Sequence, residues 1–199
     1  MRRLTSLALA LALALGVTLA FAGGAAGIKS STTVHRFIAF NGKSLAPTLK
    51  VTKRGRGYCW VGSIADGRAD AWRCFLGNSI LDPCFSKGKL SKPFVVCPIA
   101  PWSRRVTVLV LTKPIPLAEG NATNSSSTEP WGIVTANGKH CLAFTGATGV
   151  IGGRYIRYGC QEGGVLLGEP GRHTPVWTIF YAARNSSRQI RVGITDAWS

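Results

Sequence analysis

Six cysteines constrain the fold of this chain more than any other feature of its sequence. The 199-residue chain carries them as Cys59, Cys74, Cys84, Cys97, Cys141 and Cys160. An even set of cysteines in an exported chain is typical of a disulfide framework. The sequence alone does not choose among the many possible connectivities. We favour pairing of neighbours, because each neighbouring pair brackets a run that reads as two strands and a turn.

The cysteines do not predict a metal site. The sequence contains no C-x-x-C, and its three histidines, His35, His140 and His173, have no zinc-ligand spacing. We therefore interpret these histidines as surface or hydrogen-bonded residues. If all six cysteines pair, no thiol remains for catalysis.

The N-terminal segment predicts export. Arg2 and Arg3 precede a long uncharged run that ends in Ala20-Phe21-Ala22, which is the pattern of a cleaved signal peptide. We expect a signal peptide over residues 1–22, a flexible arm over 23–33, and a mature protein that is secreted or held at the cell envelope. The alternative is that the apolar run remains as a membrane anchor. No later run of spanning length follows.

The charge of the chain is strongly basic. It has 24 Lys and Arg against 8 Asp and Glu, a net charge of +16. Without Arg2 and Arg3, 22 basic residues against 8 acidic ones leave +14. Such an exported protein is expected to bind polyanions, such as anionic cell-wall polymer, acidic polysaccharide, acidic lipid headgroups or extracellular nucleic acid. The alternative is a generic basic surface without a dedicated ligand. We expect no sequence-specific nucleic-acid target.

Short β-branched and aromatic runs between turn residues predict an all-β fold with little helix. We expect one antiparallel sandwich or barrel-like domain over residues 34–199, stabilised by about three disulfides. The expected strands are residues 34–40, 58–62, 71–76, 106–111, 131–135, 140–145, 154–158, 176–181 and 189–195. Asn137-Gly138 predicts a type I′ hairpin turn. Residues 118–130 are polar and predict a surface loop.

A glycine-rich run, Thr145-Gly146-Ala147-Thr148-Gly149 and onward, has the spacing of a dinucleotide-binding turn. That turn needs a helix after its glycines and an acidic residue at the end of the next strand. The residues after Gly149 are glycine-broken and β-branched, and Glu162 and Glu169 lie in predicted turns. We therefore expect no nicotinamide cofactor, and interpret the run as a connection between two strands joined by Cys141 and Cys160.

Catalytic signatures are sparse. Ser63 lacks the G-x-S-x-G frame of a nucleophile elbow. A two-carboxylate hydrolase would have to use Asp66, Asp70 or Glu169, and turn formation or pairing with arginine is the more common role for such residues. Asp82-Pro83 is interpreted as a turn before Cys84. We assign no catalytic residue.

Aromatic and basic residues alternate in one stretch, Arg154-Tyr155-Ile156-Arg157-Tyr158. On a strand, Tyr155 and Arg157 would share one face, and Arg154 and Tyr158 the other. Rings beside guanidinium groups can stack on ligands while holding anions. We therefore take Arg154, Tyr155, Arg157 and Tyr158 as a candidate ligand surface, and most of the six tryptophans as core.

Several motifs together resemble a group of exported bacterial proteins without an established activity. They are GYCWVGSIADGRADAWRCFLGNSILDPCF, VVCPIAPW, LAFTGATGV, RYIRYGC, PVWTIFY and ITDAW, which cover most of residues 57–198. The cysteine frame with GNxxxDPCF and TGATG is the most specific part. The resemblance implies export, disulfides and bacterial origin, and it supplies no catalytic residues.

The sequence favours a non-catalytic binding module for an anionic cell-wall polymer or polysaccharide. Two alternatives stay open. One is an extracellular hydrolase that acts on cell wall or polysaccharide, and the other is a protein-binding module, such as a protease inhibitor built on the loop from Asp66 to Asp70.

Overall fold

The structure is a computed structural model that describes residues 29–87, 94–115 and 129–199. The predicted signal peptide, arm residues 23–28 and surface-loop residues 118–128 lie outside the described residues. Within the described part there is no helix, and the strands form two closed sheets with a short hairpin beside them. No helix there could cross a membrane. The expected all-β class is confirmed.

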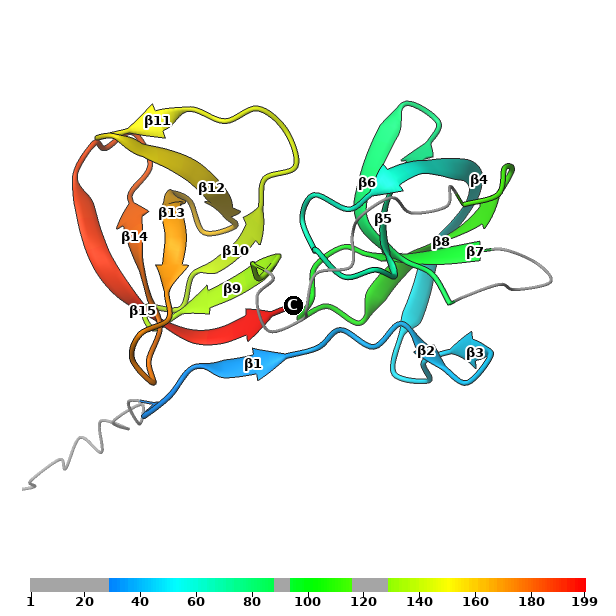
Figure 1. Cartoon of the computed structure of the whole chain (residues 1–199), viewed down its shortest axis with the longest axis horizontal. Coiled ribbons are helices and arrows are strands. Elements are labelled where there is room, and N and C mark those ends of the chain that lie inside the picture. Colours follow the sequence, from blue (N-terminus) through cyan, green and yellow to red (C-terminus); the bar gives the residue numbers. More distant parts are fainter. Residues whose placement is uncertain (1–28, 88–93, 116–128) are drawn as a thin grey trace, which may run out of the picture.

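The first closed sheet, here called the five-stranded barrel, is made by consecutive antiparallel strands (Figure 1). They are β4 (Lys50–Gly62), β5 (Ala71–Leu76), β6 (Ser79–Phe85), β7 (Phe94–Pro98) and β8 (Arg105–Leu111). The barrel closes because β8 also pairs in parallel with the first half of β4, from Lys50↔Arg105 to Gly57↔Leu111. The second half of β4 pairs with β5, so this one long strand contributes to both sides of the closure.

The second closed sheet, here called the six-stranded ring, follows in the chain. Its strands are β9 (Gly132–Thr135), β10 (His140–Ala143), β12 (Arg154–Cys160), β13 (Val165–Gly171), β14 (Thr178–Ala182) and β15 (Gln189–Trp198). Antiparallel pairing of β15 with β9 closes it. Three short strands precede or flank these two sheets, namely β1 (Thr33–His35), β2 (Phe40–Asn41) and β3 (Ser44–Leu45), and β11 (Val150–Ile151) pairs with the start of β12.

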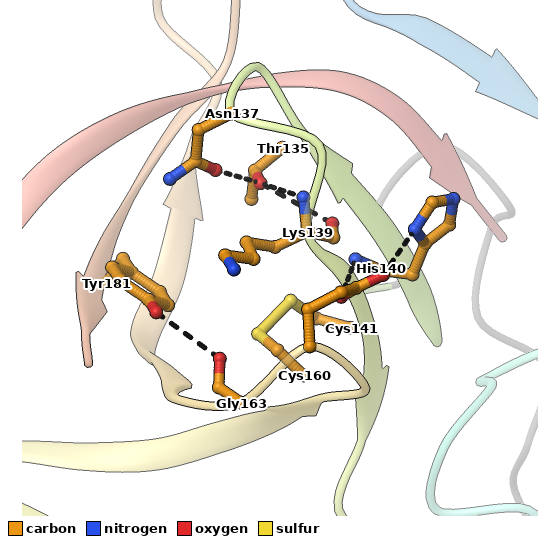
Figure 2. Close-up of a disulfide and its surroundings, with 9 residues drawn as sticks. Thr135, Asn137, Lys139, His140, Cys141, Cys160, Gly163 and Tyr181 are labelled. Atoms are coloured by element: carbon orange, nitrogen blue, oxygen red, sulfur yellow. Dashed lines mark hydrogen bonds and ion pairs between the residues drawn. A yellow bond between two sulfur atoms is a disulfide. The ribbon is translucent and has the colours of Figure 1, made fainter. Parts of the chain in front are cut away.

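Each closed sheet has an interior that contains disulfides. Cys59–Cys74 joins β4 to β5 and Cys84–Cys97 joins β6 to β7, both among the apolar side chains inside the five-stranded barrel. Cys141–Cys160 joins β10 to β12 inside the six-stranded ring, close to Tyr181 (Figure 2). These are the three neighbouring pairs that the sequence favoured. Disulfides of this number are typical of proteins that fold in an oxidising compartment.

A third apolar cluster lies between the two closed sheets and joins them. Phe37, in the segment after β1, stacks on Phe85 of β6 at 5.2 Å between ring centroids and meets Trp131 edge-on at 6.0 Å. Val96 and Val106 complete it from the outer sides of β7 and β8. Because β7 and the middle of β8 are buried on both faces, their sequences are nearly continuous apolar runs and not alternating ones.

The turn at Asn137-Gly138 and part of the N-terminal arm differ from the expectation. The Asn137-Gly138 turn is not type I′, because only Gly138 has a positive φ, 77°. Thr135 instead accepts a hydrogen bond from Gly138 N and donates one to the Lys139 carbonyl, which makes a three-residue loop. Residues 29–33 of the predicted flexible arm are held against the six-stranded ring, where Thr32 N donates to the Pro175 carbonyl.

The predicted turns at Asp82-Pro83 and Glu169-Pro170 are both inside strands, β6 and β13. In each case the pairing with a neighbouring strand shifts register beside the proline. A proline lacks the N–H that a ladder needs, and a bulge removes that need. Because the prolines indicated turns, the strands β6 and β13 were not predicted from the sequence.

The glycine-rich run is a connection between antiparallel strands, as expected. Cys141 and Cys160 are directly opposite in the β10–β12 ladder, and the chain between them forms the β11 hairpin. Gly152 and Gly153 have φ values of 52° and 79° at its turn. No helix begins at Gly149, so the structural context of a dinucleotide-binding turn is missing.

Replacing Cys141 and Cys160 together by alanine is expected to lower the free energy of unfolding by about 3 kcal/mol, since the bridge closes a loop over a sequence separation of 19. Urea denaturation followed by tryptophan fluorescence measures this change. An unaltered denaturation midpoint would show that the bridge does not constrain the unfolded chain.

Candidate functional site

The loop between β4 and β5 carries two of the carboxylates that were considered from the sequence for a hydrolase, Asp66 and Asp70, and Asp66 is buried. Asp66 is fully buried, and its Oδ1 accepts a hydrogen bond from Arg68 N at 3.0 Å. Its Oδ2 is buried and accepts no hydrogen bond. Desolvation raises the pKa of Asp66 to about 6, against the opposing effect of Arg68. This carboxyl group is part of the loop's internal structure and does not reach solvent.

Asp82 is a second buried carboxylate under the same loop. It accepts a hydrogen bond from the Ser63 hydroxyl, and Ile64 N donates to it at 3.3 Å. Ser63 Oγ in turn accepts from the backbone N–H of Ala65 and Asp66. Desolvation raises the pKa of Asp82, and the Ser63 hydrogen bond opposes that rise. Ser63 and Asp82 therefore fix the loop conformation.

The structure does not bring the three proposed hydrolase carboxylates together. Asp70 is bound by the guanidinium of Arg68 at 2.6 and 2.9 Å. Glu169 lies on β13 of the other closed sheet with 76% of its side chain exposed. Within the loop that was considered for a protease inhibitor, the side chains of Asp66 and Arg68 are buried and do not face a partner.

The predicted ligand surface on β12 is only partly formed. Tyr155 is 68% exposed, whereas Tyr158 is buried inside the six-stranded ring, because a register shift follows Ile156. Burial raises the pKa of Tyr158. Arg157 is paired with Glu129, and Arg154 lies over the Phe180 ring at 3.9 Å. Tyr158 is thus a core residue, and the other three side chains do not form one binding face.

A larger cationic and aromatic face lies outside the five-stranded barrel, and we call it the β4 face. Its residues are Arg54, Arg56, Tyr58 and Trp60 of β4, Arg73 and Phe75 of β5, and Lys113 after β8. Along β4, Cys59 points into the barrel, so by alternation Arg54, Arg56 and Tyr58 point outward. Trp60 lies at a register shift and joins the same outward row, because it stacks on Phe75.

Glycines bring the strands of this face close together. Gly57 alternates with Arg56 and Tyr58, and a Cβ there would lie 1.9 Å from the Phe75 carbonyl oxygen. A Cβ on Gly55 would lie 2.3 Å from Leu76. The inward positions of β4 must remain small for the arginine and aromatic positions to form a continuous outer row.

The rings of the β4 face touch one another and have cations beside them. Trp60 stacks on Phe75 with centroids 4.2 Å apart and planes inclined by 22°. Tyr58 lies 5.5 Å from the same ring. Lys113 Nζ is 4.5 Å from the Tyr58 centroid, and Arg73 Cζ is 5.5 Å from that of Trp60. The rings are half-buried, while Arg54 and Arg56 are exposed.

Exposed apolar side chains surround this face. Val61, Ile80 and Val110 have exposed fractions of 45%, 45% and 44%. Two of them are direct strand partners of the face, since Ile80 pairs with Phe75 and Val110 with Arg56. The acidic group closest to Arg73 in the described structure is Asp82, at 3.8 Å, and its side chain is only 1% exposed. The surface is therefore positive and apolar together.

Two histidines lie in a row of rings where the closed sheets meet, and we call this row the seam rings. His35 stacks on Trp198, Trp198 meets Trp102 edge-on, and Trp102 meets His140, at 4.7, 5.6 and 5.0 Å. His35 pairs with Asp196, and His140 with Glu162, each at 2.8 Å. Both histidines are hydrogen-bonded, as expected. Trp102 of the five-stranded barrel lies between rings of the other sheet.

The carboxylates beside the seam rings have lowered pKa values. For Asp196, desolvation acts against the lowering, and hydrogen bonds from His35 and Lys29 outweigh it. For Glu162, desolvation is again outweighed, here by hydrogen bonds from the backbone and side chain of His140. Both carboxylates are thus held ionised as partners of histidine.

Cavities in the described part of the molecule include one large groove and one small pocket. One is an open groove of about 1400 Å³ on the six-stranded ring, between the β11 hairpin and the loops at 161–164 and 183–187. The other, of about 110 Å³, lies beside Tyr158, Arg157 and Glu129. Neither is lined by Asp66, Asp70 or Glu169. No group of three or more His, Cys, Asp and Glu side chains suited to a metal occurs among the described residues.

Comparison of the chain with protein-family models, with curated proteins and with solved structures gave no match.

Sequence reasoning missed the β4 face, although its signal is visible in KRGRGYCWVG. Arg54, Arg56, Tyr58 and Trp60 alternate there with two glycines and a cysteine. The glycines hid the strand, because glycine is depleted in strands. The partners Phe75, on β5, and Lys113, in the segment after β8, could not be assigned without the fold.

The Asp66→Asn substitution tests the buried carboxyl group. Since folding raises its pKa to about 6, the native protein loses stability from this group as pH rises through that value. The variant lacks this loss, and its advantage in unfolding free energy over the native protein should grow between pH 4 and pH 8, towards on the order of 2 kcal/mol.

Urea denaturation of both proteins across that pH range measures the difference. A difference that stays constant with pH would show that Asp66 titrates normally in the folded state.

Proposed function

We propose that this protein is a secreted or envelope-held binding module that recognises an anionic extracellular polymer through the β4 face. The observation that carries the proposal is the outward row of Arg54, Arg56, Tyr58 and Trp60, with Arg73 and Lys113 on either side. Exposed guanidinium groups bind carboxylate and phosphate through paired hydrogen bonds. Rings and apolar side chains beside them add contact area to the repeating unit of a polymer.

The charge of the whole chain supports the same function. With a net charge of +16, the protein attracts polyanions from a distance and raises their association rate. Three disulfides suit a module that works in an oxidising environment outside the cell. The buried Asp66 and the Arg68-bound Asp70 give no support to a hydrolase that would use them.

Replacing Arg54 and Arg56 together by alanine is expected to weaken retention on an immobilised acidic polysaccharide. The protein should be retained at roughly 0.01 M salt and released towards roughly 1 M, because the Debye length falls from about 30 to about 3 Å. The double variant should elute at distinctly lower salt, since it lacks two contacts at the binding face. Elution from a salt gradient measures the change.

A variant with alanine at Arg184 and Arg188 is the matched control. Both side chains are exposed on the loop between β14 and β15, so the same amount of charge is lost far from the β4 face in the chain. It should elute close to the native protein. Equal shifts for both double variants would mean that net charge, and no particular face, governs retention. Retention that ignores salt would contradict the proposal altogether.

A further inference from the structure

The β4 face has a shape that suits a linear ligand with a repeating unit. Outward side chains two residues apart on a strand are separated by about 6.6 Å. The row from Arg54 to Trp60 therefore extends over roughly 20 Å, with cations at one end and rings at the other. A ligand that lies along it meets charge-binding groups and flat apolar groups in succession.

The three aromatic rings of the β4 face add a stacking surface, which binding of charge alone does not require. Tyr58, Phe75 and Trp60 form one contiguous aromatic surface, and it is only half-buried. A sheet that presents rings outward can stack on unpaired nucleobases, which have a flat apolar face in every repeating unit. A polymer whose charge is attached directly to a saturated sugar ring gains less from such stacking.

Cations lie next to the rings as well as along the row. Lys113 Nζ and Arg73 Cζ are 4.5 and 5.5 Å from the centroids of Tyr58 and Trp60. When a base stacks on these aromatic rings, the phosphate of the same nucleotide lies within a few ångströms of the two cations. Lys113 is exposed, and a lysine side chain has a long rotatable stem, so its Nζ can move from the Tyr58 ring to that phosphate. An exposed cation–π contact is weak enough to be exchanged.

We propose that the β4 face binds single-stranded nucleic acid without sequence preference, with nucleobases stacked on Tyr58, Phe75 and Trp60 and phosphates held by Arg54 and Arg56. This inference rests on the proposed function, because it names the class of anionic polymer that the same face takes. Stacking on aromatic rings tolerates every base, so this mode of binding needs no specific target sequence. The apolar side chains Ile80 and Val110 flank the bases.

The test compares three probes on the purified protein. They are a fluorescein-labelled oligothymidylate of about 12 nucleotides, within the length range that such faces cover, inorganic polyphosphate, and polygalacturonate. The native protein should bind the oligonucleotide more tightly than either competitor at equal charge concentration. Binding is followed by fluorescence anisotropy, with polyphosphate and polygalacturonate as competitors.

Replacing Tyr58 and Trp60 together by leucine is expected to weaken oligonucleotide binding about tenfold or more, because two stacking platforms are lost. Affinity for polyphosphate should remain unchanged, since the arginines are intact. Trp60→Phe keeps a ring and should retain most of the affinity. Tyr155→Leu is the matched control. It removes an exposed aromatic side chain from β12, in the other closed sheet, and should leave oligonucleotide binding unchanged.

A measurement on the native protein covers the case in which the leucine variant does not fold. The indole N–H resonance of Trp60, assigned by its loss in Trp60→Phe, should shift on addition of oligothymidylate and stay in place on addition of polyphosphate. Equal affinity for all three probes without a ring-dependent effect would overturn the nucleic-acid inference and leave the proposed function standing. Failure to bind any of the three would overturn both.

Discussion

The contact between the two closed sheets is made by the apolar cluster around Phe37, and one buried cation, Arg68, holds the backbone of Phe37 in place. The Arg68 side chain is 6% exposed, donates to the Phe37 carbonyl at 2.9 Å, binds Asp70 and lies 4.5 Å from the Phe85 centroid. Burying a guanidinium is costly unless all sides of it are engaged, and here its partners come from three separate segments. The seam covers the outer sides of β7 and of the start of β8, where Val96 and Val106 lie, and the outward residues Arg54 and Arg56 of β4 remain exposed.

Internal pairing of the acidic residues explains the positive surface. The structure describes seven of the eight carboxylate side chains, since Glu119 lies outside the described residues, and each is buried or lies beside a basic group. Asp196, for example, receives both Lys29 and His35. Acidic charge is thus used to fix loops and the seam, and the exposed row on β4 is positive for that reason.

The sequence predicted those properties of the fold that depend on local pattern. Strand-like runs, the absence of long helical periodicity and neighbouring cysteines led to the all-β class and to the three disulfides. The division into two closed sheets was not predicted, because it depends on pairings such as Lys50 with Arg105 that are remote in sequence. Prolines disguised β6 and β13, and glycines disguised β4. The β4 face escaped prediction because its members come from β4, from β5 and from the segment after β8, which only the closed barrel brings together.

β15 has an unusual place in this architecture, since it pairs with β14, β9 and β1. It is the last described strand, and it closes the six-stranded ring to a strand that lies more than fifty residues earlier, as in the pairing of Trp198 with Gly132. The five-stranded barrel needs no residue beyond Leu111 for its strand pairings. During synthesis, which starts at the N-terminus, the five-stranded barrel can therefore form before β15 is available to the six-stranded ring. Until β15 is added, the unpaired edge of β9 is the part most exposed to wrong pairing.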